Sequence, residues 1–100
     1  MLRYLLTMIQ DHVRDEALIH PAFDRLKRYD AEKREELYET LYQYLLNERS
    51  IVQSAQALGI HKNSLLYRLQ RMESIIDVDL EAPEKRTYLL LSYFMDKFLK

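Results

Sequence analysis

The alternation of hydrophobic and polar positions along the 100-residue chain is typical of short amphipathic helices. Between residues 2 and 13 the apolar positions recur at helical spacing: Leu2, Leu5, Leu6, Ile9 and Val13. A second apolar stripe contains Leu18, Ile19, Phe23 and Leu26. Pro21 interrupts it, because proline lacks a backbone donor and favours the first turn of a helix. We therefore expect a helix over residues 2–13, a break near His20 and a new helix starting at Pro21.

Residues 31–47 show the most regular amphipathic pattern of the chain. One side is apolar or aromatic: Leu37, Leu41, Tyr44 and Leu45, with Tyr38, Tyr42 and Leu46 beside them. The opposite side is polar: Glu32, Lys33, Glu35, Glu36, Glu39 and Gln43. This pattern predicts one helix from Ala31 to Asn47, followed by a link that extends through Arg49.

The next segment predicts two short helices joined by a tight turn. Ser50 followed by Gln53 is a capping pattern, which indicates a helix from Ile51 to Leu58. After Gly59 an inward-facing stripe recurs at intervals of four, three and four residues: Leu65, Leu69, Met72 and Ile76. Crossing helices need a small side chain where they touch, here Ala55, and a turn residue that tolerates positive φ. The spacing predicts a helix-turn-helix over residues 50–76, with Ser54 where an apolar residue is common.

A last helix is expected over residues 83–99, after a connection that begins at Asp77. Pro83 suits its first turn. The helix is apolar on most of its circumference: Tyr88, Leu89, Leu90, Leu91, Tyr93, Phe94, Met95, Phe98 and Leu99. Such a helix needs cover on more than one side, and either the rest of the domain or a second subunit supplies it.

Composition supports an all-α fold in a single compact domain over residues 1–100, with about five or six helices. The chain has 48% hydrophobic residues, 1 Gly and 2 Pro, so residues that punctuate sheets are scarce. The N-terminal helices fall within residues 1–47. No apolar run is long enough to cross a bilayer, and no Cys is present. We expect no membrane span and a cytoplasmic location.

An enzyme would leave a trace in the sequence, and none is found. The histidines His12, His20 and His61 lie in different expected elements, and one glycine cannot form a Gly-rich phosphate loop. We therefore expect no catalytic residues, no metal site and no cofactor.

The charge distribution favours nucleic-acid binding at one place. Arg49, Lys62, Arg68 and Arg71 are the only charged residues between positions 49 and 72, in a chain whose net charge is −1. A locally basic helix-turn-helix therefore lies within an acidic remainder, and double-stranded DNA is the expected partner.

The second helix of the motif, residues 61–74, is expected to enter the major groove. Free backbone donors at a helix start favour phosphate, which assigns His61, Lys62, Asn63 and Ser64 to groove contacts. Tyr67 lines the same outward edge as Asn63. Arg68 and Arg71 are expected to neutralise phosphates or to bind guanine in bidentate fashion.

The run from His61 to Leu69, with Asp79-Leu80, Pro83 and Arg86, resembles the C-terminal helix-turn-helix domain of PucR/CdaR-type transcription regulators. The resemblance covers roughly residues 36–99, and more weakly extends back to about Ile19. By motif match, Asn63, Tyr67 and Arg68 keep the family residues, and Lys62 and Ser64 are close substitutes. Three positions depart from the family pattern: Leu66 replaces a common Arg, Gly59 a frequent aromatic residue, and Ala82 an acidic residue that should cap the last helix.

The resemblance implies an all-helical DNA-binding domain that ends a longer regulator. The effector-sensing region of such a regulator is absent from this chain, which is either an excised domain or a short stand-alone relative. A homodimer through the helix over residues 84–99 is also expected, because such readers usually bind two half-sites. The alternative is a helical protein-interaction module that does not bind DNA, and salt dependence of binding separates the two.

Overall fold

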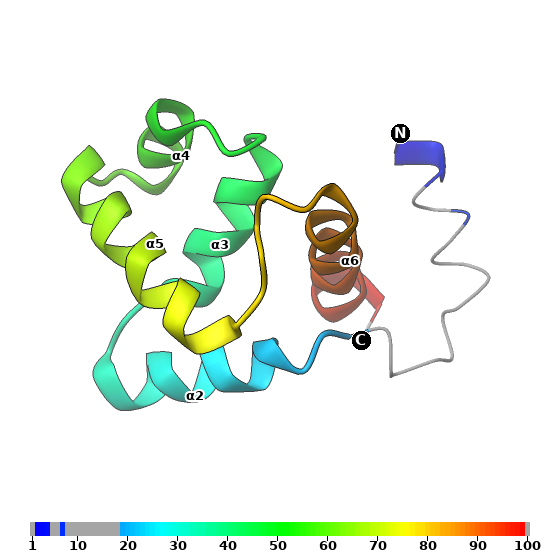
Figure 1. Ribbon diagram of the computed structural model, residues 1–100, viewed down its shortest axis with the longest axis horizontal. Coiled ribbons are helices and arrows are strands. Elements are labelled where there is room, and N and C mark those ends of the chain that lie inside the picture. The colour runs from blue at the N-terminus through cyan, green and yellow to red at the C-terminus, as the bar shows by residue number, and fades with distance from the viewer. Residues whose placement is uncertain (1, 5–6, 8–18, 100) are drawn as a thin grey trace. The chain divides into compact units, whose positions relative to one another are not determined.

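The computed structural model describes residues 2–4, 7 and 19–99, and shows a chain of helices (Figure 1). They are α2 (Ala22–Lys33), α3 (Leu37–Leu46), α4 (Ile51–Leu58), α5 (Lys62–Ile76), α6 (Pro83–Phe94) and the π-helical turn η2 (Met95–Leu99). The described residues contain no strand, so the prediction of an all-α fold is confirmed. Most of the helix expected over residues 2–13 lies outside the described residues.

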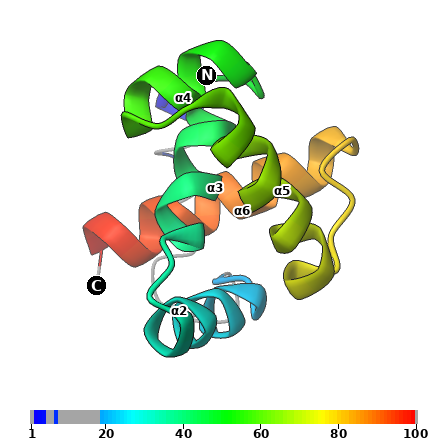
Figure 2. The same cartoon turned by 90° about the vertical axis from the view of Figure 1, so that its left-hand side faces the viewer.

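The chain divides into two compact units, Pro21–Asp79 and the combination of Met1–His20 with Leu80–Lys100. The first unit contains α2 to α5, and α5 packs against each of the other three helices. Figures 1 and 2 show α5 running from α4 at one end of this unit to α2 at the other. The expected single domain over residues 1–100 stays a prediction.

The core of the Pro21–Asp79 unit is aliphatic with one aromatic ring. Its large hydrophobic side chains with almost no exposed surface are Phe23, Leu26, Leu37, Leu41, Leu65, Met72 and Ile76. Each such side chain contributes about 1.5–3 kcal/mol relative to its exposed state. The inward stripe predicted on the second motif helix is confirmed, with Leu69 half-buried rather than buried.

The prediction of one helix from Ala31 to Asn47 is wrong, because the chain turns between Lys33 and Leu37. Arg34 adopts a left-handed conformation with φ 56°, and its N–H donates to the Asp30 carbonyl. The Asp30 carboxylate then accepts from the N–H groups of Leu37 at 2.8 Å and Tyr38 at 3.0 Å. One residue thus closes the end of α2 and caps the start of α3, which satisfies amides that a helix start leaves unpaired.

The start of α4 follows the sequence prediction. Ser50 is the N-cap residue of α4, and its Oγ accepts from the Gln53 N–H at 3.1 Å. The preceding link includes Glu48 and Arg49, which both have positive φ. The Arg49 N–H donates to the Tyr44 carbonyl at 2.8 Å, so this link is held by the end of α3.

In the second unit, α6 begins at Pro83 as predicted, and Ala82 supplies no side-chain cap. His20 is tied to this helix, since its N–H donates to Ser92 Oγ at 3.0 Å and its ring lies 5.0 Å from that of Tyr88. The expected helix to residue 99 changes from α to π at Met95. No helix in the described part of the chain has the length and apolar character needed to cross a membrane.

Several apolar side chains of α6 are buried. Leu89, Leu91 and Tyr93 are buried, and so is Met95 at the start of η2. At the end of η2 the side chains of Phe98 and Leu99 are 67% and 46% exposed. The sequence left open whether the chain or a second subunit covers this helix, and that question stays open.

Candidate nucleic-acid interface

The turn between α4 and α5 is built on Gly59, which has φ 67° as predicted. Its N–H donates to the Gln56 carbonyl at 3.1 Å, and the next N–H, of Ile60, donates to the Ala55 carbonyl at 3.0 Å. No heavy atom lies within 4 Å of the position of a Cβ at residue 59. The left-handed backbone, and not crowding, therefore favours glycine at this position.

Inside the motif, α4 packs through two small residues, Ser54 and Ala55, which are both buried. Ser54 has no accessible surface, and its Oγ has no hydrogen-bond partner among the described residues. The sequence marked this position as unusual for a helix-turn-helix. The structure adds that this serine is buried.

The first turn of α5 projects into solvent. His61 is the N-cap residue, and its Nδ1 accepts from the Asn63 N–H at 3.0 Å. Because Nδ1 is the acceptor, the neutral ring carries its proton on Nε2, where it is a donor. His61, Lys62, Asn63 and Ser64 are all exposed, and the first turn has no acidic residue. The positive end of the α5 dipole is therefore open to an anion.

Tyr67 and Arg71 form a pair on the outward face of α5, one and two turns after Asn63. The Arg71 Nε donates to Tyr67 Oη at 3.2 Å, and its Cζ lies 5.7 Å from the ring centre. This hydrogen bond raises the pKa of Arg71 above its ordinary value. Tyr67 remains 52% exposed, which leaves much of its ring available for contact.

Arg68 points away from this face toward α3. Its Nη1 donates to Thr40 Oγ1 at 2.9 Å and lies 3.9 Å from Glu36 Oε2. Thr40 is fully buried and donates its own hydroxyl to the Glu36 carbonyl at 2.7 Å. The Arg68 side chain is 18% exposed, so it acts as a bridge between α5 and α3. Its expected contact with DNA stays a prediction.

A shallow, open depression joins the first half of α5 to the α2–α3 turn. It is lined by Glu35, Asn63, Ser64, Tyr67 and Arg68. Four of the seven predicted site residues thus share one surface, together with a carboxylate that the sequence did not suggest.

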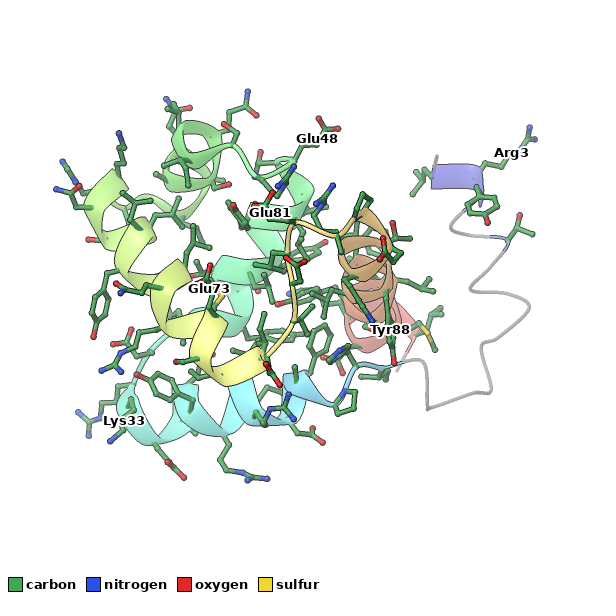
Figure 3. All side chains as sticks on the ribbon, viewed as in Figure 1. Arg3, Lys33, Glu48, Glu73, Glu81 and Tyr88 are labelled. Atoms are coloured by element: carbon green, nitrogen blue, oxygen red, sulfur yellow. The ribbon has the colours of Figure 1, made fainter. Side chains whose placement is uncertain are left out.

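The far end of α5 is held by Arg25, a residue that sequence reasoning missed. The Arg25 Nε donates to the Ile75 carbonyl at 3.0 Å and its Nη2 to the Ile76 carbonyl at 3.1 Å. The last carbonyls of a helix carry partial negative charge, so a guanidinium there is stabilising. No local pattern announces this contact, because 50 residues separate Arg25 from Ile75. Figure 3 labels Glu73, the acidic residue of α5, in the C-terminal half of this helix.

A short helix joined by a left-handed glycine to a longer helix that is exposed at its start defines a helix-turn-helix protein. Residues 37–93 match the model of the PucR C-terminal helix-turn-helix domain, and the chain belongs to this family. The resemblance seen in the sequence is therefore confirmed.

Several curated proteins of Bacillus subtilis (strain 168) are similar to the chain. The proline-responsive transcriptional activator PutR is 36% identical over 72% of this chain and 18% of its own length. The DNA-binding transcriptional activator AdeR is 30% identical over 70% of this chain and 17% of its own. The purine catabolism regulatory protein is 33% identical over 69% of this chain and 14% of its own length. The chain thus spans less than a fifth of these relatives, and no solved structure gives a significant match.

Proposed function

We propose that this chain binds double-stranded DNA in a sequence-specific manner, with α5 inserted into the major groove. The observation that carries the proposal is the exposed first turn of α5, which lacks acidic residues and is preceded by the His61 cap. Membership of the PucR helix-turn-helix family supports it, as do relatives that are named transcriptional activators.

The proposed contacts follow from what each side chain offers. Lys62, the Nε2–H of His61 and the free amides of the first turn bind phosphate. Asn63, Ser64 and Tyr67 meet base edges, and Arg71 binds phosphate beside them. The inward contacts of Arg68 support a positioning role, in which it fixes the angle of α5 on α3.

We further propose that the protein acts in the cytoplasm as a homodimer that reads two half-sites about 34 Å apart. The exposed Phe98 and Leu99 at the end of η2 support an interface at the C-terminal helix. Sedimentation equilibrium at micromolar concentration tests this, and a monomer that binds a single half-site would contradict it.

Titration of a fluorescent 30-base-pair duplex over a range of salt concentrations tests DNA binding. The logarithm of the association constant should fall linearly with the logarithm of salt, by about 0.9 per phosphate contact. Lys62→Ala and Arg71→Ala should each lower the magnitude of this slope by about 0.9. Lys85→Ala, an exposed lysine of α6, is the matched control and should leave the slope unchanged.

Two results would contradict the proposal. The first is an association that is undetectable at low salt, which would favour the helical protein-interaction module. The second is an equal slope for the parent, Lys62→Ala and Lys85→Ala, which would remove the first turn of α5 from the interface.

A further inference from the structure

Leu66 is an apolar side chain on the outward face of α5. Its neighbours Leu65 and Leu69 are buried and half-buried, so the leucine-rich face of the helix points inward without it. Leu66 is 43% exposed, and the residues three before and four after it on the helix are Asn63 and Gln70, both exposed. Residues at these spacings are neighbours on a helix surface. The outward face therefore combines one aliphatic side chain with two amides.

The two arginines that would bind guanine from this helix are both engaged. Arg68 donates to Thr40 on α3. Arg71 donates to the Tyr67 hydroxyl and lies over its ring. An arginine must direct its planar donors at O6 and N7 of guanine to read that base. Either arginine would first have to give up its hydrogen bond before it could bind guanine.

We infer that α5 selects A·T base pairs, with the 5-methyl group of a thymine packed against Leu66 and adenine edges bound by Asn63 and Gln70. This inference rests on the proposed function. In the major groove the thymine methyl is the apolar group that a base pair presents, and it matches an aliphatic side chain. Side-chain amides of Asn and Gln are the bidentate partners of adenine N6 and N7. One face of α5 thus carries both halves of an A·T contact.

The size of the methyl contribution can be estimated. Burial of one methylene-sized group is worth about 0.8 kcal/mol, which corresponds to about a four-fold change in the dissociation constant. Replacement of the contacted thymine by uracil removes only this methyl group, because the Watson–Crick edge is unchanged. Replacement of the whole A·T pair by G·C should weaken binding by at least about five-fold.

The experiment starts with selection of duplexes from a random pool by the unaltered protein. Fluorescence anisotropy then measures the selected duplex against versions with uracil at single thymine positions. We expect an A·T-rich core, and one thymine in each half-site whose replacement weakens binding by about four-fold. A thymine outside the footprint serves as the control position and should show no effect.

Two variants connect the effect to one side chain. Leu66→Ala should remove the difference between thymine and uracil. Leu46→Ala is the matched control, because Leu46 is an α3 leucine with 41% exposure, and it should keep the four-fold difference. Far-ultraviolet circular dichroism confirms that both variants fold.

The outcomes separate this inference from the proposed function. A selected G·C-rich core, or equal affinity for thymine and uracil at every position, would overturn the inference while leaving DNA binding intact. A difference that survives in Leu66→Ala would overturn the role of Leu66. Failure of the protein to retain any duplex at low salt would refute the proposed function itself.

Discussion

Thr40→Val tests how firmly α5 is fixed on α3. The substitution keeps the shape of a fully buried side chain and removes the hydroxyl that accepts from Arg68 at 2.9 Å. A hydrogen bond with a charged donor is worth about 1.5–3 kcal/mol. The Glu36 carbonyl loses little, since it also accepts the Thr40 N–H at 3.0 Å.

We expect the free energy of unfolding to fall by about 2 kcal/mol, toward the lower end because water reaches part of the Arg68 side chain. For a domain of this size that is a decrease of about 8–16 °C in Tm. Urea unfolding followed by circular dichroism measures the change. A double-mutant cycle with Arg68→Met should give a coupling energy of about 1–2 kcal/mol. Additivity of the two substitutions within about 0.5 kcal/mol would refute the bridge.

The same variants decide what Arg68 does in the proposed complex with DNA. If Arg68 positions α5, both Thr40→Val and Arg68→Met should weaken binding without changing the salt slope. If Arg68 instead contacts phosphate, Arg68→Met alone should lower the magnitude of the slope by about 0.9. Because the slope counts released counterions, the measurement separates a positioning role from a direct contact.

Three further substitutions test the motif and its support. Gly59→Ala should lower the free energy of unfolding by about 1–2 kcal/mol, because there is space for a Cβ but a backbone with φ 67° disfavours one. Thermal unfolding measures this change. Ser54→Ala should stabilise the protein by about 1 kcal/mol through loss of a buried, uncompensated hydroxyl, whereas a fall in Tm would indicate a hidden partner. Arg25→Met should lower the free energy of unfolding by about 1–2 kcal/mol, because the last carbonyls of α5 lose their donor. Arg28 is an exposed residue of α2, and Arg28→Met should lower it by less than about 0.5 kcal/mol in the same urea experiment.

The parts of the fold that the sequence predicted are those with local signals. Ser50 caps its own helix within three residues, and Gly59 adopts a conformation that favours glycine. Pro83 fixes the first turn of α6. Each of these acts through the residue itself and its immediate neighbours, so the bounds of α4 and the start of α6 follow from reading the chain.

The break between α2 and α3 could not be predicted for the opposite reason. The residue that turns the chain is Arg34, a good helix former whose left-handed conformation gives no signal in the sequence. The cap of α3 comes from Asp30, seven residues before Leu37. The hydrophobic period continues across the break, because the apolar faces of both helices meet the same core. The periodicity therefore predicted correctly which side chains face the core, but it did not predict that the helix is interrupted.

In the candidate site, the sequence likewise did not predict which groups the charged side chains contact. Sequence reasoning assigned Arg68 and Arg71 to DNA on charge and helical spacing, but a side chain's partner is set by the fold. Arg25 and Arg68 attach the end and the middle of α5 to neighbouring segments, and Arg71 stiffens Tyr67 on the surface. Two guanidinium groups, those of Arg25 and Arg68, thus fix the orientation of this helix.

This distribution of contacts has a consequence for recognition. In the proposed complex with DNA, the exposed charge of Lys62 at the start of α5 attracts every duplex equally, because phosphates are the same at every base pair. The difference between sequences must then come from the neutral side chains that α5 holds at fixed positions, among them Asn63, Leu66 and Gln70. A rigid helix makes small contacts of this kind selective, because the backbone does not shift to restore a methyl or amide contact that a different base pair removes. Loss of the Arg68 bridge should therefore reduce discrimination between sequences more than affinity for DNA as such.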